Sequence, residues 1–247
     1  MDLNKIISDY EKNGFVIVKN VIENEEIERL RKEYFHVLNN NPDLREDEIS
    51  SHILQSCSEW RYFIGHSDIL NIVEAFIGSN IAHFYSRFFV KKPKIGREVP
   101  WHQDGAYYPL RPLELCTVWV GMSKSHRGNG GLRVIPGSHR QQLSKLKDVN
   151  DESCVLKRVM DQNKVNDIDS IDLNTDIGDL VIIHPHLEHA SYRNNSDEWR
   201  MSIAIRYINT STQITWKELY GKDWDCCYLL RGDVVKGIDN QYILEGA

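Results

Sequence analysis

Short runs of β-type residues, separated by turn-forming clusters, fill the last two thirds of the sequence and constrain its fold most strongly. The runs lie at residues 81–90, 115–122, 132–135, 180–183 and 200–208. Between them are clusters such as 127–131 and 136–138, whose glycine, proline, asparagine and serine residues favour turns. Many short strands joined in this way are typical of a β-sandwich or a β-barrel.

The first 80 residues show helical periodicity, apart from an apolar run at 15–18 that predicts a short buried strand. Asn24 is suited to a helix N-cap, because acidic residues occupy the turn that follows it. The apolar positions behind it recur at helical spacing, namely Ile27, Leu30, Tyr34 and Val37. A second helix is predicted after Ser67 and up to Gly78, with an apolar face of Ile69, Ile72, Val73 and Phe76.

No linker, repeat or low-complexity tract divides the 247 residues. We therefore predict one domain over 1–247, with a mostly helical part at 1–80 packed on a barrel core at 81–247. The net charge of −6 argues against a nucleic-acid partner, since phosphate binding needs a dense basic surface. No apolar run reaches the roughly 18 residues of a membrane span, so no membrane partner is expected.

The cysteines predict a reducing compartment. There are five, two of them are adjacent, and none forms a CxxC pair, which fits neither a disulfide framework nor a zinc ribbon. We expect them to be small, mostly buried apolar side chains. The first 15 residues also lack the apolar core of a signal peptide, so a cytoplasmic location is predicted.

The last β-type run, RMSIAIRYI at 200–208, alternates between two kinds of side chain. Successive side chains of a strand point to opposite faces, so one face is formed by Met201, Ile203, Ile205 and Tyr207. The other face is small and polar, and carries Arg200, Ser202, Ala204 and Arg206. This is the pattern expected of a barrel strand that packs on one side and faces a polar ligand on the other.

The segment at 100–105 contains the motif His102-x-Asp104. In an extended strand these two side chains project to the same side and can bind one metal ion. A third ligand must come from elsewhere, and His189 is the best candidate, although spacing alone does not choose between it, His184 and His186. Two histidines and one carboxylate leave coordination positions open, as in non-haem Fe(II) oxygenases, whereas structural zinc sites close their shell, usually with cysteine. Ordinary surface or turn residues remain the alternative for a lone motif of this kind.

Arg200 follows His189 by eleven residues and lies on the polar face of the last strand. A buried arginine needs an anionic partner, and its planar guanidinium suits a carboxylate. A dicarboxylate such as 2-oxoglutarate can chelate iron at one end and pair with Arg200 at the other. A structural salt bridge to one of the 36 acidic residues is the alternative.

Taken together, these segments resemble the phytanoyl-CoA dioxygenase family of Fe(II)- and 2-oxoglutarate-dependent oxygenases. The resemblance is carried by WHQDGAYYPLRP at 101–112, CTVWVGM at 116–122, GNGGLRVIPGSHR at 128–140 and the segment 178–207. It begins at 10–31 and so spans nearly the whole chain. The combination of HxD, PGSH and HxS followed by asparagine and arginine, in this order, is specific, although each motif alone is not.

The resemblance implies a mainly β fold with flanking helices, a double-stranded β-helix or jelly-roll barrel. It also implies the iron ligands, which are His102, Asp104 and His189. The implied reaction uses Fe(II), 2-oxoglutarate and O₂ to hydroxylate an unactivated C–H bond of a small molecule, with release of succinate and CO₂. Halogenases of the family carry a small residue in place of Asp104, so the carboxylate implies hydroxylation or a related oxidation.

By the same resemblance, Arg200 binds the distal carboxylate of 2-oxoglutarate, and the cosubstrate is lined by Trp119, Ser191 and Phe88. Some relatives add a lysine upstream of the HxD motif, but residues 48–55 contain no match for it. Around the iron, we predict substrate contacts from Tyr85, Tyr107, Tyr108 and Arg111. The basic cluster Lys91-Lys92-Pro93-Lys94 with Arg97 is interpreted mainly as a solvated loop, with binding of an anionic substrate group as the alternative.

Two other functions are compatible with the same barrel. One is a different metalloenzyme, either a zinc hydrolase or a cupin dioxygenase that needs no keto acid. The other is a non-catalytic jelly-roll binding protein. Arg200 argues against the first, because those chemistries need no buried cation there, and the intact ligand set argues against the second. The sequence leaves the substrate and the oligomeric state open.

Overall fold

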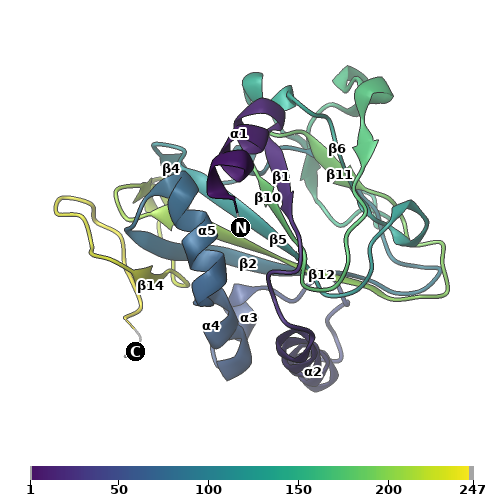
Figure 1. The fold of residues 1–247 in the computed structure, drawn as a ribbon, viewed down its shortest axis with the longest axis horizontal. Coiled ribbons are helices and arrows are strands. Elements are labelled where there is room, and N and C mark those ends of the chain that lie inside the picture. The colour runs from purple at the N-terminus through teal and green to yellow at the C-terminus, as the bar shows by residue number, and fades with distance from the viewer. Residues whose placement is uncertain (1, 245–247) are drawn as a thin grey trace.

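The computed structural model describes residues 2–244, which form two antiparallel β-sheets flanked by helices (Figure 1). Along the larger, six-stranded sheet lie β1 (Phe15–Val18), β10 (Leu180–Ile183), β5 (Leu115–Gly121), β12 (Arg200–Asn209), β2 (Ile81–Lys91) and β14 (Tyr228–Arg231). Along the smaller, four-stranded sheet lie β3 (Val99–His102), β11 (His189–Ser191), β6 (Leu132–Val134) and β9 (Ile171–Asp172). All five runs that the sequence marked as β-type are strands.

The order of the strands identifies the fold as a jelly roll. Eight strands from β2 to β12 belong to these two sheets, and consecutive ones alternate between the sheets except β6 and β9, which both lie in the smaller sheet. Each sheet therefore pairs strands that are distant in the sequence, such as β2 with β12 and β3 with β11. This is the double-stranded β-helix that the resemblance implied.

Helices cover the outer face of the larger sheet (Figure 1). They are α1 (Leu3–Asn13), α2 (Asn24–Asn40), α3 (Ser51–Leu54), α4 (Ser58–Ile64) and α5 (Ser67–Ile77). The predicted apolar stripe of α2 is buried, although Asn24 is its first residue and Glu23 is the N-cap. In α5, Gly78 ends the helix with a positive φ of 80°, which glycine adopts without strain. Sequence reasoning did not locate α1, whose one buried residue is Ile6, or the short helices α3 and α4.

The other elements are short and lie in the connections. Two-residue strands form the pairs β4 (Leu110–Arg111) with β13 (Gln213–Ile214) and β7 (Lys147–Asp148) with β8 (Arg158–Val159). Helix α6 spans Trp216–Tyr220. Single 3-10 turns lie at η1 (Asp104–Ala106), η2 (Arg127–Asn129), η3 (Ser138–Arg140), η4 (Gln162–Lys164) and η5 (Asp167–Asp169). Within residues 2–244, no helix has the length and apolar character needed to cross a bilayer.

Strand β12 separates the main core from the interior of the barrel, and its alternation is as predicted. Its apolar face packs with the helices in the largest hydrophobic cluster. Its polar face points between the sheets, where Arg200, Ala204 and Arg206 line an inner pocket. Cross-strand neighbours share a face, so the register places four side chains of β2 beside this polar face, namely Tyr85, Arg87, Phe89 and Lys91.

The five cysteines are free and buried, which agrees with the role expected of them. Burial raises the pKa of Cys116 to about 12, as it does for Cys226. Such thiols carry little thiolate at neutral pH and act as apolar packing groups.

Candidate active site

Three predicted ligands converge where the two sheets face each other. His102 ends β3, Asp104 begins η1, and His189 begins β11, directly opposite His102 in the sheet register. Asp104 Oδ1 lies 3.8 Å from His102 Nε2 and 4.0 Å from His189 Nε2. The imidazole centroids are 4.0 Å apart, and all three residues are buried. The strand pairing of β3 with β11 therefore joins residues that are 87 positions apart in the chain.

Backbone carbonyls fix the orientation of both imidazole rings. The Nδ1 atom of His102 lies 2.9 Å from the carbonyl oxygen of Pro100, and that of His189 lies 2.9 Å from the carbonyl oxygen of Leu187. A carbonyl only accepts, so each Nδ1 carries the proton and each Nε2 presents its lone pair toward Asp104. Metal-binding histidines are held in this way.

The other two histidines of the segment point elsewhere. His184 packs against the rings of Tyr10 and His139, and His186 Nδ1 lies 3.1 Å from the carbonyl oxygen of Gln141. The geometry therefore selects His189 from the three histidines that spacing left open.

Two side chains from the larger sheet hold the carboxylate of Asp104. The hydroxyl of Thr117 donates to Oδ2 at 2.7 Å, and the Arg206 guanidinium donates to Oδ1 at 3.1 Å and to Oδ2 at 3.3 Å. Burial alone would raise the pKa of Asp104, but the Arg206 cation together with the two neighbouring histidines outweighs burial and holds that pKa well below its usual range. Burial lowers the pKa of His102 to about 3 and also lowers that of His189. At neutral pH the three groups are thus two neutral imidazoles and one carboxylate, the forms that bind a metal.

Arg206 and Thr117 are site residues that sequence reasoning missed. The alternation of the last strand placed Arg206 on the inner face, but it did not show which acid the guanidinium would meet. Thr117 lies beside Arg206 in the sheet register. A contact of this kind depends on strand pairing, which the local sequence pattern does not specify.

A small inner pocket lies beside the three ligands and contains the predicted cosubstrate arginine. All three ligands line it, together with Trp119, Ser191 and Arg200. Arg200 is buried and donates from Nη1 to the hydroxyl of Ser202 at 2.7 Å and to the carbonyl of Phe89 at 3.1 Å. Its Nε is buried without a hydrogen-bond partner, and no carboxylate among residues 2–244 pairs with it. Within residues 2–244 the structure therefore does not support the alternative of a structural salt bridge.

The chemistry of this pocket fits the cofactor and cosubstrate that the resemblance implied. Burial without a counter-ion lowers the pKa of Arg200 to about 9, so an anion in the pocket would stabilise the guanidinium. Two imidazoles and one carboxylate are a suitable donor set for Fe(II) that leaves coordination positions open. The orphaned Nε of Arg200 and the three ligands thus fit a dicarboxylate held between the metal and the arginine.

The prediction for Phe88 is not supported, because its side chain points away from the pocket. Phe88 packs in the helix-facing core, where its ring lies 5.0 Å from that of Tyr34. The adjacent Phe89 lines the pocket instead. The cause is the two-residue alternation of β2, since a shift of one position moves a side chain to the other face of the sheet.

Lys91 is a second buried cation in the barrel, and its assignment to a solvated loop was wrong. It ends β2 opposite Arg200, and its Nζ donates to the hydroxyl of Ser191 at 2.8 Å and to the carbonyl of Tyr192. Burial, with Arg200 nearby, lowers the pKa of Lys91 well below its ordinary value. Lys92 and Lys94 do lie at the surface. The alternation of Tyr85, Arg87 and Phe89 was the signal that could have placed Lys91 inside.

A larger cavity of about 490 Å³ lies outside the inner pocket, and His102, Asp104, Phe89 and Arg206 line both. The predicted substrate residues Tyr85, Tyr107 and Tyr108 line this outer cavity. Arg111 does not, because its side chain is 74% exposed and lies 3.7 Å from Glu218. The outer cavity also has a wall that sequence reasoning missed, formed by Trp216, Tyr220 and Trp224. These residues lie in a segment whose short elements carry no periodic signal.

Comparisons with known proteins agree with this architecture. A family model described as Phytanoyl-CoA dioxygenase (PhyH) matches residues 10–202. The peroxisomal phytanoyl-CoA dioxygenase of Mus musculus is 29% identical over 231 residues, which cover 83% of this chain and 68% of that protein. The Homo sapiens protein is 28% identical over 228 residues, which cover 81% of this chain and 66% of that protein. The chain thus spans about two thirds of the length of these relatives.

Solved structures show the same fold at lower sequence identity. The non-heme monooxygenase ThoJ in its apo form gives a TM-score of 0.78 at 21% identity, covering 98% of this chain and 87% of that one. The epimerase SnoN, in complex with Fe3+, alpha ketoglutarate and nogalamycin RO, gives a TM-score of 0.73 at 19% identity, covering 95% of this chain and 96% of that one. The matched segment 10–202 includes the three ligands and Arg200. The chain therefore belongs to the phytanoyl-CoA dioxygenase family of Fe(II)- and 2-oxoglutarate-dependent oxygenases.

Proposed function

We propose that this protein hydroxylates an unactivated C–H bond of a small-molecule substrate, with 2-oxoglutarate converted to succinate and CO₂. The observation that carries the proposal is Arg200, a buried cation that has no acidic partner in the described part of the chain and lines the same pocket as the His-Asp-His cluster. Family membership supports the reaction class, and the geometry supports the assignment of residues.

His102, Asp104 and His189 would hold the iron through Nε2, a carboxylate oxygen and Nε2. When bound, iron with 2-oxoglutarate and O₂ supplies the oxidising power for hydroxylation. The protein contributes orientation: Thr117 binds Oδ2 of Asp104, Arg206 binds both carboxylate oxygens, and Oδ1 lies within about 4 Å of both imidazole Nε2 atoms. The carbonyl oxygens of Pro100 and Leu187 keep both rings in the required tautomer.

Arg200 would bind the distal carboxylate of 2-oxoglutarate, beside Ser191 and Trp119. The hydroxyl oxygen of Ser191 already accepts a hydrogen bond from Lys91, so its own hydrogen is available for a carboxylate oxygen. Trp119 supplies an apolar wall. Two donors and an aromatic surface would thereby fix the cosubstrate beside the metal ligands.

The outer cavity would receive the substrate, since it reaches His102 and Asp104 and has room for a small molecule. Tyr85, Tyr107 and Tyr108 would contact it. We also keep one domain over 1–247, small-molecule partners and a cytoplasmic location as parts of the proposal. The buried free cysteines support the last of these.

Arg200 also favours this function over the two alternatives. A zinc hydrolase, or a cupin dioxygenase that needs no keto acid, gains nothing from an unpaired guanidinium beside its metal. A non-catalytic binding protein has no use for imidazoles whose Nε2 atoms are aimed at one point. A carboxylate-bearing cosubstrate accounts for both features.

The proposal is tested by measuring succinate release over a panel of metabolites, in air, with Fe(II) and ascorbate. We expect one class of substrate to raise succinate release and to give a hydroxylated product in equal amount. Arg200→Ala should weaken 2-oxoglutarate binding about 30-fold or more while iron binding is retained, as for loss of a buried charged partner. Arg193→Ala is the control, because Arg193 is exposed. Unchanged affinity in Arg200→Ala would remove the proposed role of that arginine.

A further inference from the structure

Four cationic side chains lie on the inner faces of two neighbouring strands. Strand β2 supplies Arg87 and Lys91, and β12 supplies Arg200 and Arg206. The one buried acid among the residues that line the two pockets is Asp104. Lys91, Arg200 and Arg206 are buried and Arg87 is half-buried. A charge removed from water needs a counter-charge or hydrogen bonds in compensation, so this excess points to anionic ligands.

The proposed cosubstrate accounts for only part of the excess. Arg206 pairs with Asp104. Arg200 lines the inner pocket, and Lys91 donates to Ser191 on the wall of that pocket. Arg87 lines the outer cavity and not the inner pocket. A 2-oxoglutarate molecule held by Arg200 therefore leaves the charge of Arg87 without a partner.

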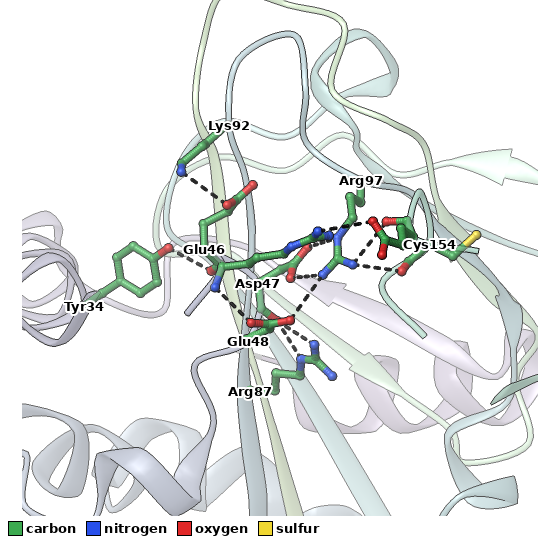
Figure 2. Close-up of polar contacts among 10 residues, drawn as sticks. Tyr34, Glu46, Asp47, Glu48, Arg87, Lys92, Arg97 and Cys154 are labelled. Atoms are coloured by element: carbon green, nitrogen blue, oxygen red, sulfur yellow. Dashed lines mark hydrogen bonds and ion pairs between the residues drawn. The ribbon is translucent and has the colours of Figure 1, made fainter. Parts of the chain in front are cut away.

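The surroundings of Arg87 hold the guanidinium in place without neutralising it. Its Nε and Nη2 donate to the backbone carbonyl of Asp47 at 2.8 and 2.6 Å. The carboxylate of Asp47 is bound instead by Arg97, which donates to Oδ2 from Nε at 2.8 Å and to Oδ1 from Nη2. Figure 2 shows Asp47 between the two arginines. Among residues 2–244, Nη1 of Arg87 has no hydrogen-bond acceptor and no carboxylate forms an ion pair with Arg87.

The rest of the outer cavity is mainly aromatic. The guanidinium of Arg206 lies 5.8 Å from the ring centres of Tyr85 and Tyr108. Two further acids line the cavity, but both are exposed and engaged: Asp223 lies 3.1 Å from Lys217, and Asp225 lies 3.2 Å from His52. The two remaining cations of the lining are Arg158 and Lys222. The deep part of the cavity thus combines flat apolar walls with positive charge.

We propose that the substrate is an anionic small molecule with a flat, largely apolar body. Its carboxylate or phosphate group binds Nη1 of Arg87, and the tyrosine and tryptophan rings hold the body against the metal ligands. This inference rests on the proposed function and specifies the substrate class of the same site. Charge-assisted hydrogen bonds to arginine and aromatic packing together set the preference.

The test compares three probes that share one ring system and differ in charge: 2-naphthoate, 2-naphthyl phosphate and neutral 2-naphthamide. Each is titrated calorimetrically, under anaerobic conditions, into the protein loaded with Fe(II) and 2-oxoglutarate. We expect at least one anion to bind about tenfold or more tighter than the amide, and the two anions distinguish a carboxylate site from a phosphate site. Equal affinities, or no binding of either anion, would overturn the inference.

Two variants assign the preference to Arg87. Arg87→Met should weaken the preferred anion about tenfold or more and leave the amide unchanged. Arg111→Met is the matched control, since Arg111 is exposed at the same end of the barrel but outside the cavity. An equal effect of both substitutions would contradict the assignment. The probe comparison on the unaltered protein decides the matter if Arg87→Met does not fold.

The same samples separate this inference from the proposed function. Binding of 2-oxoglutarate to Fe(II) at the site gives a visible absorption band before any probe is added. If the band forms and the amide binds as well as the anions, the substrate class is wrong and the proposed function stands. If no band forms, the proposed function fails whatever the probes do.

Discussion

At the scale of single residues, Asp104 shows how much of the site depends on groups from other strands. Its carboxylate is fixed by Thr117 from β5 and Arg206 from β12, while its two imidazole neighbours come from β3 and β11. The motifs and the family resemblance together named the three side chains that the structure brings to one point, and Arg200 beside them. They did not predict Thr117, Arg206 or Lys91, because alternation shows which face a side chain occupies but not which partner it meets.

Removal of the hydroxyl that holds Asp104 should weaken the metal site. Thr117→Val keeps the shape of the side chain and deletes the 2.7 Å hydrogen bond to Oδ2. We expect metal affinity to fall about 10-fold, as for the loss of a group that orients a ligand, in anaerobic titrations with Fe(II). Thr212→Val is the control, because the hydroxyl of Thr212 is buried without a partner. Equal metal affinity in both variants would show that Thr117 does not orient the ligand.

Lys91 should influence cosubstrate binding through Ser191. Lys91→Met keeps the length of the side chain but removes the donor that directs the Ser191 hydroxyl. We expect 2-oxoglutarate to bind about 10-fold more weakly, measured calorimetrically with Fe(II) present, while metal affinity stays the same. Lys94→Met is the control, since Lys94 is exposed and lies 3.0 Å from Asp197. If both variants bind 2-oxoglutarate with the affinity of the unaltered protein, Lys91 has a packing role and does not influence cosubstrate binding.

At the scale of the element, the alternation of β2 places core-packing side chains on one face of the strand and pocket-lining side chains on the other. Odd-numbered residues from Tyr85 to Lys91 face the barrel interior, whereas Phe88 and Val90 face the helices. The sequence predicted the strand but assigned Phe88 to the interior, because the resemblance aligned it with a cosubstrate position. Strands β3 and β11, with the sequences VPWH and HAS, lack the aliphatic residues that marked the equally short β10 and β6.

Substitution of the two adjacent phenylalanines should give opposite results. Phe88→Ala should lower the free energy of unfolding by about 3–5 kcal/mol, since it opens a cavity in the main core, and urea denaturation measures this loss. Phe89→Ala should cost less stability and mainly weaken binding of 2-oxoglutarate, because Phe89 lines both pockets. A larger loss of stability from Phe89→Ala than from Phe88→Ala would show that Phe89, and not Phe88, packs in the main core.

At the scale of the whole molecule, buried histidines lie both in the barrel interior and in the helix-facing core, where His83 packs against Trp60, and they make stability depend on pH. His83 lies in β2, where its Nε2 is 2.7 Å from the hydroxyl of Ser86 and its Nδ1 is 3.2 Å from the carbonyl oxygen of Cys226. Burial lowers the pKa of His83 to about 3. The overall jelly roll could be predicted from strand spacing and the family motifs. The aromatic wall from residues 216–224 could not, since it depends on how an irregular segment packs.

The lowered pKa of His83 predicts loss of stability in acid. An unfolded histidine binds a proton below about pH 6.5, and the folded one does not until about pH 3. The unfolded state therefore gains protons first, and the free energy of unfolding should fall by up to about 1.4 kcal/mol per pH unit from this residue as pH drops through that range. Urea denaturation at pH 7 and pH 5 should show a smaller pH effect in His83→Asn than in the unaltered protein. The exposed His36→Gln is the control, and an equal pH effect in all three proteins would contradict the account.

The most direct test of the whole account is an anaerobic spectral titration of the metal-free protein with Fe(II) and then 2-oxoglutarate. We predict one iron per chain and a visible charge-transfer band on addition of 2-oxoglutarate. The band should be absent in His189→Ala and retained in His186→Ala, whose ring lies outside the cluster. No band in the unaltered protein, or an undiminished band in His189→Ala, would contradict the claim that these three residues and Arg200 bind iron and its cosubstrate.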